Sequence, residues 1–186
     1  ERLGGTLCLN DPVAEIETDG KRATGVRTKS GWHQQADAVA TNGDLMHTYR
    51  DLLPNHPRGK KAAKSLKRKR WSPSLFVVHF GLKGSFPEIP HHMILFGPRY
   101  KGLLDDIYKN GRVPEDFSLY LHHPSVTDPA MAPAGCDTFY VLAPVPNLQS
   151  GTDWAAHAEP YRAAIAKALE ETVLPNLSEH LTVSLM

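Results

Sequence analysis

The chain has 186 residues, of which 41% are hydrophobic, and a formal net charge of +1 at pH 7. This length and composition allow one sizeable core or two small ones and exclude a disordered tail. The longest nearly unbroken apolar run, residues 75–82, contains His79 and is far shorter than the roughly 18 residues that suggest a membrane-spanning helix. We therefore expect a globular chain without a transmembrane segment.

Cys8 and Cys136 are the only cysteines, and the sequence contains no CxxC motif. Such sparse cysteine favours a reducing compartment with two free thiols. The first five residues, Glu-Arg-Leu-Gly-Gly, include neither an initiator methionine nor a basic and apolar leader. We expect the chain to be a piece of a longer protein.

The first 43 residues are predicted to form a short β-meander. Asp19-Gly20 and Ser30-Gly31 are typical of hairpin turns, because glycine supplies the positive φ that tight turns require. After Asn42 the pattern changes to longer polar runs with helical spacing, so we place a domain boundary near residue 43. The strands are predicted at residues 6–10, 13–18, 25–29 and 36–40.

The second region, residues 44–186, is predicted to be a mixed, mainly antiparallel sheet with helices packed on it. Prolines at positions 54 and 57 separate its first two helical patterns. The fold class is therefore α+β. We predict helices at residues 45–53, 60–69, 100–108 and 153–172, and strands at residues 75–82, 93–96, 117–122, 138–143 and 181–186.

Eight basic residues fall within a short segment of a nearly neutral chain. A solvated helix face is the ordinary explanation. Nucleic acid is disfavoured as a partner because no aromatic residues interleave with these charges and no nucleic-acid-binding motif lies beside them. An anionic membrane surface fits better, since each Lys or Arg near it contributes about 1 kcal/mol. The eight are Arg58, Lys60, Lys61, Lys64, Lys67, Arg68, Lys69 and Arg70. Those assigned to membrane contact are Lys60, Lys61, Lys67, Arg68 and Arg70.

Two adjacent histidine pairs, His91-His92 and His122-His123, raise the question of a metal site. Neighbouring side chains of a strand point to opposite faces, so neither pair can hold one ion alone. The chain also has no HExxH motif and no cysteine partner for them. We predict that the chain has no metal site.

Three predicted strands each carry one broad apolar face, since alternate residues of a strand share a face. An ordinary hydrophobic core would explain these faces. If the sheet instead covers a cavity, its uncharged lining would suit a hydrocarbon ligand. The candidate substrate-binding residues are Phe76, Val78, Phe80, Phe117, Leu119, Leu121, Phe139 and Val141.

Several long stretches, distributed in order along the chain, match a known family. They are LGGTLCLNDPVAEIE, ADAVATNGDLMHTYRDLL, SLFVVHFGL, HHMILFGPRY, EDFSLYLHHPSVTDPAMAPAGC and YVLAPVPNL. Through them the chain resembles the carotenoid desaturases of the bacterial and fungal phytoene desaturase type, which belong to the amine-oxidase-like, two-domain flavoprotein superfamily.

The resemblance implies an FAD-dependent oxidoreductase that introduces double bonds into a long apolar isoprenoid. The family's glycine-rich fingerprint and its second FAD-contacting segment lie outside these 186 residues. The resemblance thus implies that residues 1–43 belong to the FAD domain and residues 44–186 to the substrate domain. By itself this piece is expected to bind no FAD and to be inactive. The whole enzyme is expected in the cytoplasm, attached peripherally to the inner membrane.

Three residues match cofactor-contacting positions of the family. Val13 resembles the position whose backbone meets the adenine end of FAD. Thr41 and Asn42 resemble the strand end beside the cofactor, where the chain crosses into the substrate domain. Gly43 stands where the family more usually has alanine, and the stretch KRKRWSPSLF also departs from the family pattern.

The proline-bearing segment between residues 122 and 138 carries no recognisable chemistry, and the resemblance implies that it shapes a rim of the substrate channel. A catalytic group is not needed there, because a flavin carries the redox chemistry. Two alternatives stay open: a non-catalytic module for apolar ligands or membrane surfaces, and a related flavin enzyme of the retinoid saturase or amine oxidase type. A GxGxxG fingerprint upstream would favour an enzyme over the module.

Overall fold

The computed structural model describes residues 3–185 and divides into two compact units, Glu1–Arg70 and Trp71–Met186. The boundary predicted near residue 43 falls inside the first unit. The first strand of this unit, which precedes the predicted boundary, contacts the helical segment Thr48–Leu52, which follows it. The assignment of residues 1–43 and 44–186 to two different domains of a complete enzyme stays a prediction.

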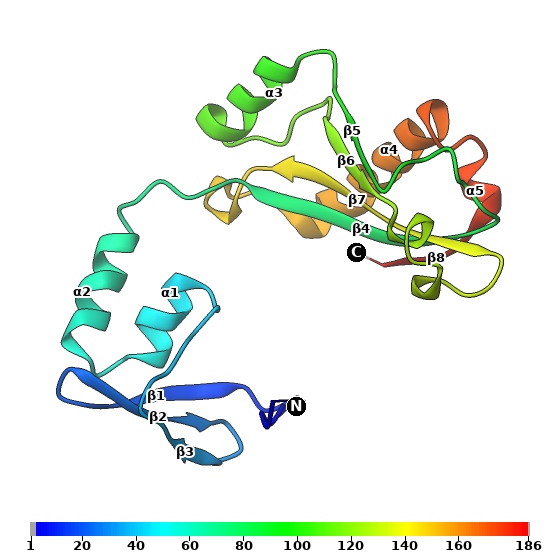
Figure 1. Cartoon of the computed structure of the whole chain (residues 1–186). Coiled ribbons are helices and arrows are strands. Elements are labelled where there is room, and N and C mark those ends of the chain that lie inside the picture. Colours follow the sequence, from blue (N-terminus) through cyan, green and yellow to red (C-terminus); the bar gives the residue numbers. More distant parts are fainter. Residues whose placement is uncertain (1–2, 186) are drawn as a thin grey trace. The chain divides into compact units, whose positions relative to one another are not determined.

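The first unit contains a three-stranded antiparallel sheet in the order β1-β2-β3 (Figure 1). Both predicted turns are confirmed, and Gly20 and Gly31 have φ values of 57° and 93°. The strands predicted at residues 6–10 and 36–40 are wrong, since neither segment pairs as a strand with another in the described residues. The strands are β1 Val13–Asp19, β2 Arg22–Thr28 and β3 His33–Gln35.

The two helical regions predicted for the first unit are confirmed. Asp44 begins the first of them, and its carboxylate accepts a hydrogen bond of 2.8 Å from the His47 N–H. The second begins earlier than predicted, at Pro57, because a proline fits the first turn of a helix, where its missing N–H has no partner to lose. The elements are α1 Leu45–His47, the π-helical segment η1 Thr48–Leu52 that continues it, and α2 Pro57–Leu66.

The second unit contains a five-stranded sheet in the order β5-β6-β7-β4-β8, with every neighbouring pair antiparallel. All five predicted strands are present, although the one expected from residue 117 starts at Leu119. The last one is described to Leu185, and Met186 lies outside the described residues. The strands are β4 Ser74–Lys83, β5 His92–Leu95, β6 Leu119–His122, β7 Cys136–Val145 and β8 Leu181–Leu185.

Two helices of the second unit lie against one face of this sheet, and the α+β fold class is confirmed (Figure 1). The longest helix begins after Asp153, whose carboxylate accepts hydrogen bonds from the N–H groups of Ala155 and Ala156. None of the described helices combines the length and the apolar character needed to cross a membrane. The helices are α3 Tyr100–Asp105 with its π-helical continuation η2 Asp106–Asn110, α4 Trp154–Thr172 and α5 Leu177–His180.

Helix α4 builds the core of the second unit. Its buried side chains, Tyr161, Ile165 and Leu169, recur every four residues and therefore share one face of the helix. This face packs on every second residue of β4 and β7, so the same alternation is buried in both strands. The sheet thus has a face covered by α4, which we call the core face, and an opposite face.

Candidate functional site

The eight residues predicted to contact a substrate lie on or against the core face. Seven of them are at most 8% exposed, and the eighth, Phe117, is partly buried and packs against the same core. These side chains therefore form the core instead of an open channel wall, because α4 fills the space above them. A substrate contact by any of them stays a prediction. The seven are Phe76, Val78, Phe80, Leu119, Leu121, Phe139 and Val141.

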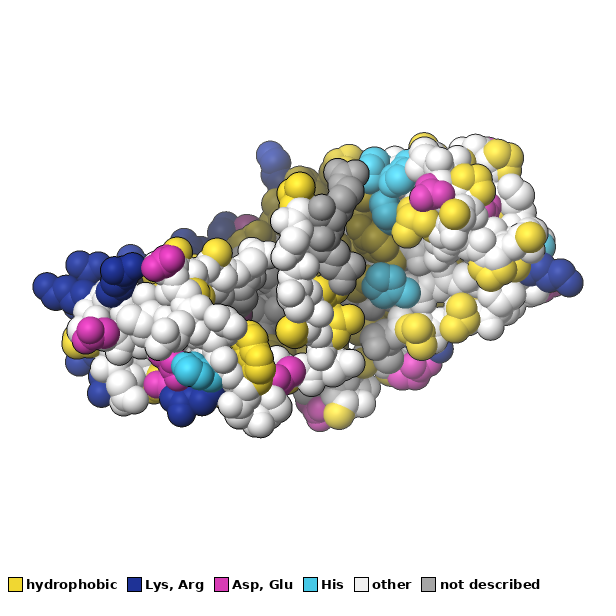
Figure 2. Space-filling model, turned by 60° about the horizontal axis from the view of Figure 1, so that its bottom comes forward, with side chains coloured by type: hydrophobic (Ala, Val, Ile, Leu, Met, Phe, Trp, Pro, Cys, Tyr) yellow, Lys and Arg dark blue, Asp and Glu magenta, His cyan; other side chains and the backbone are white. Residues whose placement is uncertain are grey.

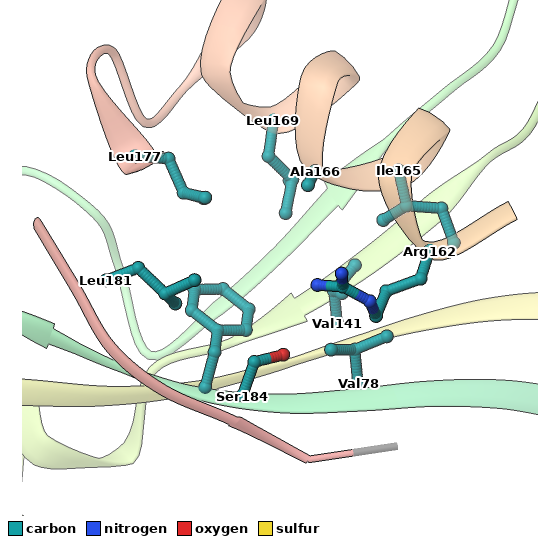
Figure 3. Close-up of a pocket in the computed structure, with 10 residues that line it drawn as sticks. Val78, Val141, Arg162, Ile165, Ala166, Leu169, Leu177, Leu181 and Ser184 are labelled. Atoms are coloured by element: carbon teal, nitrogen blue, oxygen red, sulfur yellow. The ribbon is translucent and has the colours of Figure 1, made fainter. Parts of the chain in front are cut away.

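A small apolar pocket remains between α4 and the sheet, lined in part by Val78 and Val141 (Figure 3). Ile165 and Leu169 point into it from α4, and Arg162, which is paired with Glu159, also lines it. Its empty space is about 320 Å³, including the part open to solvent. This volume lies at the bottom of the range of ligand sites, roughly 300–1,000 Å³, so the pocket suits a small ligand better than a long hydrocarbon.

The opposite face of the sheet carries two rows of side chains that run across the strands. In one row Ile94 lies opposite Tyr120, and the row continues through β7 to β4. The second row runs from β5 to β8. All of these side chains are half-buried or exposed. We call the nine residues the open face: Ile94, Tyr120, Leu142 and Val77 in the first row, and His92, His122, Tyr140, His79 and Leu185 in the second.

The open face contains no lysine, arginine, aspartate or glutamate. Tyr140 is at its centre, with ring centroids 4.5 Å from His122, 5.4 Å from His79 and 5.8 Å from Tyr120. Burial raises the pKa of Tyr120, so its phenol stays neutral. Burial and the neighbouring histidines lower the pKa of His122, so its imidazole is neutral near pH 7. The result is a broad, aromatic surface without acidic side chains, lysine or arginine.

Sequence reasoning missed a group of three histidines at the edge of this face. It is true that sequence neighbours on a strand diverge, but β5 and β6 are paired so that His92 lies opposite His122. One nitrogen from each of His91, His92 and His122 lies within 4.8 Å of the others. The prediction that the chain has no metal site was based on adjacent histidines of one strand. The group forms instead through the pairing of two strands, which the sequence did not show.

Ser125, His123 and Asp137 lie together, but not in the order of a catalytic triad. The Ser125 hydroxyl donates to Asp137 Oδ1 at 2.8 Å, and His123 Nε2 lies 3.3 Å from Asp137 Oδ2, so both partners contact the acid and the serine is not activated by the histidine. His123 is completely buried, and its Nδ1 lies 2.9 Å from the carbonyl oxygen of Ile89. These contacts hold the segment after β6 against β7, the strand that contains Asp137.

The predicted cofactor residues lie in the first unit and are exposed. Val13 begins β1 opposite Thr28, and Thr41 and Asn42 lie in the segment between β3 and α1. The Thr41 hydroxyl accepts a hydrogen bond of 3.3 Å from the Gly43 N–H. Next to this turn, the buried Thr48 hydroxyl has no hydrogen-bond partner among the described residues. Thr41 and Asn42 therefore present exposed polar side chains to a ligand, whereas the Thr48 hydroxyl is buried.

The eight basic residues after Pro57 are all exposed on α2 and the segment that follows it. None of the eight forms a salt bridge with an acidic side chain in the part of the chain that the structure describes. Dark blue side chains gather on the part of the first unit that holds α2 (Figure 2). This surface is an unneutralised positive patch, which we call the basic patch.

The chain is similar to curated phytoene desaturases. It is 55% identical over 185 residues to a lycopene-forming phytoene desaturase from Paracoccus sp., a match that covers 99% of this chain and 37% of the relative. It is 46% identical over 191 residues to a neurosporene-forming phytoene desaturase from Cereibacter sphaeroides, covering 100% of this chain and 37% of that protein. The chain thus spans little more than a third of the length of these relatives.

A solved structure and a family model agree with this similarity. An oxidoreductase from Methanosarcina mazei matches the fold with a TM-score of 0.60 at 17% sequence identity, covering 94% of this chain and 36% of that one. At this identity the match shows the fold alone. The model of the flavin containing amine oxidoreductases matches residues 1–174. The chain therefore belongs to the family of flavin containing amine oxidoreductases.

Proposed function

We propose that this chain is part of an FAD-dependent oxidoreductase that desaturates phytoene, or a similar long isoprenoid hydrocarbon, in carotenoid biosynthesis. The observation that carries the proposal is the 55% identity to a lycopene-forming phytoene desaturase along 99% of this chain. The redox chemistry would come from FAD, which would supply the hydride acceptor when bound. What this chain supplies is placement of an oily molecule and part of the cofactor's surroundings.

The open face is the surface of the chain that suits such a substrate best. A polyene offers no hydrogen-bonding handle, so its binding depends on shape and on burial of apolar area, at about 0.8 kcal/mol per CH₂ group. Leu142 and Tyr140 are uncharged, half-buried and in the middle of the sheet. In this proposal the polyene lies along the open face, and the residues of the core face support that surface from behind.

In the proposed enzyme, Val13, Thr41 and Asn42 contact FAD from the first unit. The exposure of all three residues supports this assignment. A complete protein in which Thr41 and Asn42 are both replaced by alanine should retain less FAD after gel filtration than the unaltered protein. Equal flavin content per chain, measured by absorbance, would contradict the assignment.

We further propose that the basic patch docks the enzyme on the cytoplasmic face of the inner membrane. The substrate dissolves in lipid, and a surface of unpaired lysines and arginines is attracted to anionic headgroups. Neutralising Lys60, Lys61, Lys67, Arg68 and Arg70 should reduce sedimentation of the complete protein with phosphatidylglycerol vesicles. Binding to these vesicles at the unaltered level would contradict the proposal, and neutral phosphatidylcholine vesicles give the background.

Product analysis tests the main proposal. The complete reading frame is expressed in cells that accumulate phytoene, and extracts are separated by chromatography with absorbance detection. We expect products with longer conjugation, and at least tenfold less of them with Leu142→Asp, which places a charge on the open face. Leu148→Asp is the matched control, because Leu148 is 80% exposed in the segment between β7 and α4. Unchanged phytoene with the unaltered protein would contradict the function. Equal product from Leu142→Asp and Leu148→Asp would contradict the role of the open face but not the desaturase function.

A further inference from the structure

Three histidines of the second unit gather at the edge of the five-stranded sheet. His92 and His122 lie directly opposite each other on β5 and β6, and His91 immediately precedes β5. One nitrogen of each ring lies within 4.8 Å of the others. Histidine side chains lie together on this unit in Figure 2. Three imidazoles that lie this close together resemble the three protein ligands of a zinc site whose fourth position is taken by water.

The two closest nitrogens are already near the separation that a shared metal ion imposes. His91 Nε2 and His122 Nε2 lie 2.9 Å apart. Two imidazole nitrogens on one Zn²⁺, each at 2.0–2.1 Å and at a tetrahedral angle, lie about 3.3 Å apart. The two rings therefore need to separate by only a few tenths of an ångström. His92 is exposed, so its ring can shift toward the same point without disturbing the core.

Hydrogen bonds hold two of the rings from behind. The Thr127 hydroxyl donates to the Pro124 carbonyl oxygen at 3.2 Å and lies 2.6 Å from His91 Nδ1, so it accepts the Nδ1–H of His91. This tautomer leaves the lone pair of His91 Nε2 pointing at His122. His92 Nδ1 lies 2.6 Å from the Tyr120 hydroxyl. Outer partners of this kind orient metal-binding histidines and fix their tautomers.

We propose that His91, His92 and His122 form a binding site for a divalent transition-metal ion, with Zn²⁺ as the best fit. Imidazole nitrogens suit zinc, copper and nickel, and the set contains no carboxylate that would favour magnesium or calcium. Without metal, the His122 Nε2–H donates to His91 Nε2; with metal, this hydrogen is carried on His122 Nδ1, and both Nε2 lone pairs face the ion. A water molecule completes a four-coordinate shell. The site shares His92 and His122 with the open face, but its test by metal binding does not depend on the proposed desaturation.

Calorimetric titration of the complete protein with zinc chloride tests the proposal. The protein carries no histidine tag and is first dialysed against a chelator. We expect one Zn²⁺ per chain, and binding at least about a hundredfold weaker in His91→Ala and in His122→Ala. Thr127→Val should weaken binding by roughly 10–100-fold, the usual effect of losing an outer partner. His157→Ala is the matched control, because His157 is exposed on α4 and lies outside the group.

The results separate a site from chance binding by surface histidines. Zinc affinity and stoichiometry that survive in the His91→Ala/His122→Ala double variant would overturn the proposal, as would the absence of a one-to-one complex in the unaltered protein. Circular dichroism of each variant without metal reports folding. If His122→Ala does not fold, His92→Ala replaces it, since this exposed side chain is free of any core role: weaker binding supports the site, and unchanged binding overturns it.

Discussion

The two faces of the five-stranded sheet are both rich in aliphatic and aromatic side chains, yet they meet different surroundings. On the core face, Leu121 and Ala143 are completely buried under α4 and α5. On the open face, their sequence neighbours Tyr120 and Leu142 remain half-buried. Apolar composition alone therefore does not distinguish a core from a ligand surface. The distinction comes from whether a second layer of the same unit covers the face.

The largest expected loss of stability follows truncation of a side chain on the core face. Leu121→Ala should lower the free energy of unfolding of the complete protein by about 2–5 kcal/mol, because it removes a fully buried side chain and leaves a cavity that the surroundings fill incompletely. Urea unfolding followed by circular dichroism measures the change. A loss below about 1 kcal/mol would mean that this face is not a packed core.

A smaller loss of stability is expected when the buried carboxylate of Asp137 is replaced, because it accepts hydrogen bonds from two loop segments. Asp137 Oδ2 accepts from the Phe86 N–H at 2.8 Å, and Asp137 Oδ1 accepts from the Ser125 hydroxyl. Asp137→Asn should cost about 1–3 kcal/mol at pH 7, because it turns an acceptor into a donor and leaves buried groups without their partners. Asp137→Ala, measured by the same unfolding assay, gives the effect of removing the group altogether.

The effect of Asp137 should depend on pH. Burial alone would raise the pKa of this carboxyl, but the Phe86 N–H, the Ser125 hydroxyl and His123 together hold it below its usual value. A lowered pKa in the folded state stabilises the fold at pH values above the unfolded pKa of about 3.9, and this contribution is lost as the pH falls through the folded value. The difference between the unaltered protein and Asp137→Asn should therefore shrink below about pH 4. A difference that stays constant would contradict this role.

A still smaller effect is expected at the start of the helix that covers the core face. Asp153 caps α4 through the hydrogen bonds to Ala155 and Ala156. Asp153→Ala should lower the free energy of unfolding by about 1 kcal/mol, whereas Asp153→Ser should restore most of it, because a serine hydroxyl also caps a helix. Equal loss in both variants would show that capping is not the reason for the effect.

The smallest effect on stability is expected on the open face. Leu142→Ala is the same chemical change as Leu121→Ala, but the side chain is half-buried, so the loss should be at most about 1 kcal/mol. The pair of variants thus compares the two faces directly by unfolding in urea. A loss at Leu142 as large as that at Leu121 would mean that the open face is covered by another part of the complete protein.

Most helices and strands could be predicted from the sequence, because their signals are local. The alternation of residues 75–82 and 138–143 predicted β4 and β7, and the helical spacing of residues 153–172 predicted α4. The errors concern segments without such support. Residues 6–10 and 36–40 alternate as strands do, but they find no strand partner among the described residues, and a strand is stabilised by its neighbours more than by its own sequence.

Which side chains of the candidate site are covered, and which of them meet, could not be predicted from the sequence, as two cases show. Phe139 and Tyr140 occupy adjacent positions of β7, and either parity of this strand could have been the ligand-facing one. Substrate contacts were predicted for the more apolar set of alternate residues, and the structure places this set under α4. The histidine group was missed because His92 and His122 are thirty positions apart in sequence and meet through strand pairing.

By itself, the sequence determined most of the helices and strands, the sets of residues that share a face and the family to which the chain belongs. These depend on local periodicity and on long matching stretches. Only the tertiary structure decided which face of the sheet is covered and which histidines meet. The physical reason is that both features depend on partners distant in sequence. The apolar side of α4 covers one face of the sheet and leaves the other uncovered within this unit. The register of β5 against β6 determines which side chains of the two strands lie opposite each other.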